Sequence, residues 1–93
     1  MVHEMTTPLT GNEVLDRAKA FFAERVPHYG AYLEHEGPTY VTFRGQGGEE
    51  IAMATREANG GTMIRASTLL YDQAIGRFFS TLPLLTAGEQ GAA

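Results

Sequence analysis

Three arginines and two tyrosines between residues 32 and 65 are the side chains best suited to hold a ligand. Arg44, Arg56 and Arg65 carry planar guanidinium groups, which bind carboxylate or phosphate oxygens through paired hydrogen bonds. The same groups could instead form ion pairs within the chain, with Glu34, Glu49 and Glu57. The sequence therefore predicts either an anion-binding surface or a set of internal ion pairs.

Metal-dependent and nucleophilic chemistry have less support. The chain has no cysteine, and its three histidines have no second ligand at a metal-binding spacing. The glycine-rich stretch Gly45–Gly48 lacks the helix and the Gly-Lys-Ser/Thr ending of a phosphate loop, so a hairpin turn is the better interpretation. We therefore predict no catalytic residue, no metal site and no cofactor, and we disfavour an enzyme.

A sheet between Thr39 and Leu70 is expected to position Arg44, Arg56 and Arg65. Three strands joined by two glycine-rich turns are expected to form it. Asn59-Gly60 is typical of a two-residue type I′ turn, in which both central residues have a positive φ. Such a turn sets a register with three opposed pairs: Ala58 and Gly61, Met53 and Ala66, and Ile51 and Thr68.

The alternation of side chains along these strands separates a buried face from an open one. Ile51, Met53, Ile64 and Ala66 form the more apolar set and are expected to face the core, together with Val41 and Phe43 on the preceding strand. Placing Val41 opposite Ile51 requires a loop with an odd number of residues around Gly45–Gly48. A three-residue loop with a left-handed glycine meets that requirement.

A helix is expected before the sheet and another after it. Thr10 and Glu13 have the spacing of a capping box, which predicts a helix over Asn12–Arg25 that Pro27 ends. The second helix is expected to begin with Asp72 as its N-cap. Gly76 would weaken this helix and allow it to approach the sheet or the first helix closely. Its buried stripe is Tyr71, Ala74, Ile75, Phe78 and Leu82.

A further strand is predicted over Ala31–Glu36, with Leu33 inward and Tyr32 and Glu34 on the open side. The opposite alternation, which would bury Tyr32, is kept as an alternative. Residues 1–93 are expected to form a single domain, with residues 1–8 a loose leader, 9–83 the folded core and 84–93 a tail.

The expected class is α+β: a two-layer α-β-β-β-β-α fold, with a four-stranded antiparallel meander and both helices on one face. This order of elements resembles a reduced helix-grip domain, the architecture of START-like lipid-binding proteins. It also resembles one half of the TATA-binding-protein fold. The resemblance covers the order of elements alone, so it assigns no functional residue.

The open sheet face is the candidate working surface. Small residues in mid-strand are poor strand formers, and here arginines and tyrosines surround them, which indicates that something packs closely on this face. An ordinary solvated face, a homodimer contact and a small-ligand site are the three interpretations. The candidate residues are Tyr32, Tyr40, Arg44, Ala52, Ala54, Arg56, Met63 and Arg65.

The leading hypothesis is a small non-enzymatic binding or assembly domain that forms a homodimer through this face. The alternative is a helix-grip-like domain that binds a small anionic or apolar ligand, or acts as a lyase, in a shallow pocket between helices and sheet. The net charge of −4 argues against nucleic acid as a partner. No stretch has the length of a membrane span, and we expect a soluble cytoplasmic protein.

Overall fold

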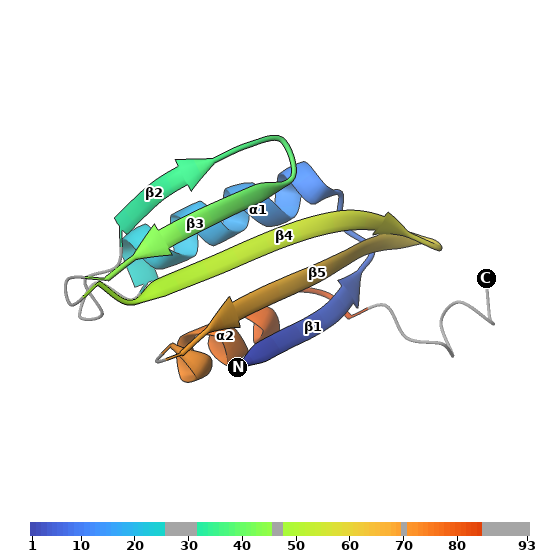
Figure 1. The fold of residues 1–93 in the computed structure, drawn as a ribbon. Coiled ribbons are helices and arrows are strands. Elements are labelled where there is room, and N and C mark those ends of the chain that lie inside the picture. The colour runs from blue at the N-terminus through green and yellow to red at the C-terminus, as the bar shows by residue number, and fades with distance from the viewer. Residues whose placement is uncertain (26–31, 46–47, 70, 85–93) are drawn as a thin grey trace.

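The computed structural model of the protein describes residues 1–25, 32–45, 48–69 and 71–84. In chain order the elements are β1 (Val2–Thr7), α1 (Gly11–Ala20), the π-helical turn η1 (Phe21–Arg25), β2 (Tyr32–Glu36), β3 (Tyr40–Arg44), β4 (Glu50–Ala58), β5 (Gly61–Thr68) and α2 (Asp72–Ser80). The strands form one antiparallel sheet in the order β1-β5-β4-β3-β2. Both helices lie on the same side of the sheet (Figure 1), which confirms the α+β class.

The prediction of four strands was wrong, because the segment expected to be a loose leader contains a fifth. β1 pairs antiparallel with β5 along its whole length. The inward side chains of this strand are His3, Met5 and Thr7, so its hydrophobic alternation is weak. His3 Nε2 lies 2.6 Å from Asp72 Oδ1. The strand is therefore held by β5 on one side and by the start of α2 on the other.

The central hairpin of β4 and β5 has the predicted register. All three expected pairs lie opposite each other: Ala58 and Gly61, Met53 and Ala66, and Ile51 and Thr68. The residues predicted for the buried face of these two strands are all buried. The two-residue connection and the alternation of side chains therefore placed every residue of this hairpin on its correct face.

The turns differ in detail from the prediction. Gly60 has a φ of +82°, whereas Asn59 has a negative φ, so the type I′ geometry was not adopted. A positive φ at the second central residue alone is the type II pattern, and glycine adopts it without strain. In the other loop Gly48 has a φ of +90°, which provides the expected left-handed glycine. Residues 46 and 47 lie outside the described residues.

The β3–β4 pairing keeps the predicted parity but is shifted by two residues. Val41 lies opposite Met53, not opposite Ile51. The Gly45 N–H donates to the Glu49 carbonyl at 2.7 Å, so the connection is centred one residue later than predicted. Moving the centre by one residue moves every pairing by two, so every side chain of β3 still lies on its predicted face.

The edge strand β2 confirms the preferred parity of the first predicted strand. Tyr32 lies opposite Arg44 and Leu33 opposite Phe43, and a bulge at Glu34 then shifts the pairing. Tyr32 is therefore on the open side. Leu33 lies on the core side, although it remains 40% exposed at the sheet edge.

The first helix begins as predicted but ends differently. Thr10 Oγ1 accepts a hydrogen bond from the Glu13 N–H at 3.2 Å, and the Thr10 N–H donates to Glu13 Oε1 at 3.1 Å. The helical segment runs from Gly11 to Arg25, close to the predicted Asn12–Arg25, but its last five residues form the wider π-helical turn η1 and not an α-helix. Both phenylalanines at the start of η1 pack against the core. Pro27 lies outside the described residues.

The second helix has the predicted buried stripe, and all five of its residues are buried. Tyr71 occupies the N-cap position without a side-chain cap, so the prediction of Asp72 as N-cap was wrong. Asp72 instead bonds to His3. Gly76 is exposed, and a Cβ added there would meet nothing within 4 Å. The expectation that it permits close packing was therefore also wrong.

Aromatic rings fill the core between the helices and the sheet. The ring of Phe22 lies 4.9 Å from that of Phe43 and 6.0 Å from that of Phe78, measured between centroids. These three side chains come from η1, β3 and α2, and each is at most 2% exposed. Their contact holds both helices against one face of the sheet and leaves the candidate site on the opposite face.

Candidate functional site

All eight predicted site residues lie on the sheet face that points away from the helices. The alternation along β3, β4 and β5 places them there, since their neighbours in sequence form the core. Tyr40 lies opposite Ala54, which in turn lies opposite Arg65. Tyr32 and Tyr40 are 55% and 42% exposed. No element in the described part of the chain covers this face (Figure 1).

Arg44 is held in place by neighbours on its own face. Its Nε donates to Glu34 Oε2 at 2.6 Å, one guanidinium nitrogen donates to the Gly48 carbonyl at 2.8 Å, and the other lies 3.5 Å from Glu50 Oε2. The hydrogen bond between the two side chains raises the pKa of Arg44 and lowers the pKa of Glu34. The bulge in β2 positions Glu34 for this contact. Arg44 therefore organises one end of the face.

Arg56 and Arg65 are more available for binding. Both are exposed, and neither forms an ion pair with another residue that the structure describes. They line a cavity of about 300 Å³, together with Ala54 and Met63. Glu4 of β1 lies on the same rim, opposite Arg65 in the strand pairing. Two exposed guanidinium groups beside a hollow can donate hydrogen bonds to the oxygen atoms of a carboxylate.

The middle of the face is a shallow depression over small residues. A hollow of about 200 Å³ lies over Ala52 and Ala54 and is bordered by Tyr40 and Arg65. The ring of Tyr40 rests over Gly37, where a Cβ would clash with it. Beside the depression, Thr42 Oγ1 is buried and has no hydrogen-bond partner in the described residues. The centre of the face is therefore a shallow hollow over small side chains, with Thr42 Oγ1 as a buried polar atom at its border.

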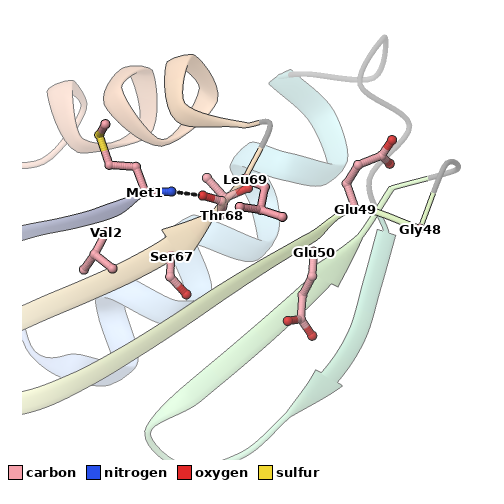
Figure 2. A pocket seen from close by; sticks show the side chains of 8 residues that line it. All are labelled: Met1, Val2, Gly48, Glu49, Glu50, Ser67, Thr68 and Leu69. Atoms are coloured by element: carbon pink, nitrogen blue, oxygen red, sulfur yellow. Dashed lines mark hydrogen bonds between the residues drawn. The ribbon is translucent and has the colours of Figure 1, made fainter.

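A larger pocket of about 410 Å³ lies at one end of the sheet, where β1 begins and β5 ends (Figure 2). Its apolar side is formed by Met1, Val2 and Leu69, and its acidic side by Glu49 and Glu50. It shares Ser67 with the central hollow, so the two depressions adjoin. Sequence reasoning missed this pocket because it exists only once β1 is paired with β5.

The histidines do not assemble a site. His35 lies on the open side opposite Thr42, while His3 contacts Asp72 on the other side of the sheet. His28 is outside the described residues. Within residues 1–25, 32–45, 48–69 and 71–84, no group of three or more potential metal ligands is found. The helices in these ranges are also too short or too polar to cross a membrane.

Comparison with known proteins adds no relative. No family model, no curated protein and no solved structure matches the chain.

Proposed function

We propose that the chain is a non-enzymatic binding and assembly domain that forms a homodimer through the open face of its sheet. The observation that carries this proposal is the depression over Ala52 and Ala54, bordered by half-exposed Tyr40 and by Arg65. Small side chains in mid-strand allow a second sheet to approach closely. The aromatic and guanidinium groups around them are enriched at protein interfaces.

The charge distribution supports a second copy as the partner. The open face carries three arginines and three glutamates (Arg44, Arg56, Arg65, Glu4, Glu34 and Glu50), so these side chains sum to zero. The complete chain has a net charge of −4, all of which lies elsewhere. Two copies would therefore repel each other less through this face than through the rest of their surface.

The size of the face is also adequate. Strands about 4.8 Å apart and about 20 Å long, in a sheet of five, give a projected area of roughly 500 Å². The relief of the side chains increases the accessible area above that projection. The accessible area of the face therefore approaches the roughly 800 Å² that each partner buries in a standard protein interface.

A second candidate is the binding of a small anionic or apolar ligand. The apolar side of the pocket of about 410 Å³ favours an apolar ligand, and the hollow lined by Arg56 and Arg65 favours an anionic one. This candidate also draws on the resemblance of the element order to a reduced helix-grip domain. However, the space between helices and sheet is filled by aromatic side chains: the ring of Phe22 lies 4.9 Å from that of Phe43 and 6.0 Å from that of Phe78. A ligand would therefore bind at the sheet end or on the open face.

The homodimer is tested by light scattering at low and high salt, on the wild type and on Ala54→Arg. We expect twice the chain mass for the wild type at both salt concentrations and the monomer mass for the variant. Gln73→Arg, an equal change at an exposed position of α2, is the matched control and should remain dimeric. A monomeric wild type, or an intact Ala54→Arg dimer, would overturn the proposal.

A further inference from the structure

The open-face side chains of β4 form a pattern that is complementary to its own reverse. Every second residue of this strand faces outward, and the first four of these residues are Glu50, Ala52, Ala54 and Arg56; Ala58 follows beside the hairpin turn. Within these four, an acidic residue stands at one end, a basic residue at the other, and two small residues lie between them. Reversing the strand direction therefore sets each charge against its opposite and each alanine against the other.

Building on the proposed homodimer, we infer that two copies pack face to face with their β4 strands antiparallel. Glu50 of each copy then pairs with Arg56 of the other. The two-fold axis lies between the sheets, runs across the strands and passes at the level of Met53. Residues 50 and 56 are each three positions from Met53, a separation of about 10 Å along the strand. A two-fold contact of this kind repeats each ion pair, so one complementary pair of residues produces two bonds.

The neighbouring strands are compatible with the same axis. The strand pairing places Val41 of β3 and Ala66 of β5 beside Met53. Around those positions, Tyr40 would face the partner's Thr42, and Arg65 would face the partner's Ser67. In neither β3 nor β5 does a charged side chain then face a like charge of the partner. An axis parallel to the strands would instead place Glu50 against the partner's Glu50 and Arg56 against the partner's Arg56, which disfavours that arrangement.

The side chains have the freedom that this pairing needs. The side chain of Glu50 is 48% exposed, and its contact with Arg44 is long, at 3.5 Å. A carboxylate has two oxygens and can accept from both arginines. Arg56 is exposed and pairs with no other described residue. Stacked sheets lie about 10 Å apart, which extended Glu and Arg side chains span from opposite sides.

The test compares the dimer Kd of three charge-reversal variants with that of the wild type: Glu50→Arg, Arg56→Glu and the double variant. Each single variant sets like charges together at both ends of the contact, so we expect the dimer Kd to rise about tenfold or more. The double variant restores opposite charges and should return to within about threefold of the wild type. An equimolar mixture of the two single variants should form the heterodimer in clear excess over half of all dimers, measured by native mass spectrometry.

Two matched controls separate this pairing from a general effect of charge. Glu57→Arg and Arg77→Glu make the same changes at exposed positions away from the outward face of β4, and they should leave the Kd unchanged. Circular dichroism verifies the fold of each variant, and Glu50→Gln replaces Glu50→Arg if the latter does not fold. With Glu50→Gln we expect a smaller rise in Kd. Mixed with Arg56→Glu it should give a smaller excess of heterodimer, because only one of the two contacts in that heterodimer is an ion pair.

The outcomes distinguish this inference from the proposed function. If Ala54→Arg breaks the dimer but the single reversals leave the Kd unchanged, the open face is the interface and the inferred pairing is wrong. A random mixture of heterodimer and homodimers from the single variants would also overturn the pairing. If the wild type is monomeric, or if Ala54→Arg stays dimeric, the proposed function itself fails.

Discussion

Replacing Phe22 by alanine should remove the side chain that joins the first helical segment to both the sheet and α2. Phe22 is 1% exposed, and its ring lies 4.9 Å from Phe43 and 6.0 Å from Phe78. Truncating a buried phenylalanine costs about 3–5 kcal/mol, from lost burial and the cavity that remains. At about 0.05–0.15 kcal/mol per residue, a chain of this length has a total stability of roughly 5–14 kcal/mol. The variant should therefore lose a large fraction of its free energy of unfolding.

The measurement is urea unfolding of wild type, Phe22→Ala and Phe21→Ala at one protein concentration, because dimerisation would make stability depend on concentration. Phe21 is the matched control: it is the adjacent phenylalanine, but it is only partly buried, with its ring 5.5 Å from that of Phe78. We expect Phe21→Ala to cost about half as much as Phe22→Ala, or less. If the two cost the same with unchanged m-values, Phe22 does not join the layers as described.

Three further predictions concern the helices and the Arg44 contact. Thr10→Ala removes the acceptor of the Glu13 N–H and should lower the free energy of unfolding by about 1 kcal/mol in urea unfolding; an unchanged midpoint would contradict the capping box. Gly76→Ala should raise stability by up to about 1 kcal/mol in the same assay, because the new methyl group meets open space; a loss would contradict the exposed position. Glu34→Gln should reduce stability at neutral pH, because the bond from Arg44 lowers the pKa of Glu34 in the folded state. Stability from a lowered carboxyl pKa is present above the unfolded pKa and is lost as the pH falls through the folded one. The difference from wild type should therefore shrink at acidic pH, and a constant difference would refute this contribution.

Local signals in the sequence predicted the centre of the fold well. The two-residue connection at Asn59-Gly60 and the alternation of side chains determined the β4–β5 register and both faces of that hairpin. The alternation also placed all eight candidate residues on the open face, because the register shift between β3 and β4 was even. Their role in an interface remains a prediction.

Features that depend on distant parts of the chain could not be predicted in this way. β1 carries His3 and Thr7 on its inward side, and its pairing partner begins more than fifty residues later. Asp72 was assigned to a local cap because its actual partner, His3, belongs to that missed strand. The sheet-end pocket was missed for the same reason, since Met1 and Val2 form one of its sides.

The missed strand also changes the properties of the open face. Without β1, Arg65 would lie on an edge strand, and the face would carry three arginines but only two glutamates. With β1 in place, Glu4 lies opposite Arg65, and the face becomes neutral and five strands wide. At the far edge, β2 is short, interrupted by a bulge and rich in charged side chains, features that oppose edge-to-edge pairing of sheets. The strand that the sequence showed least clearly therefore gives the face the width and charge balance on which self-association depends.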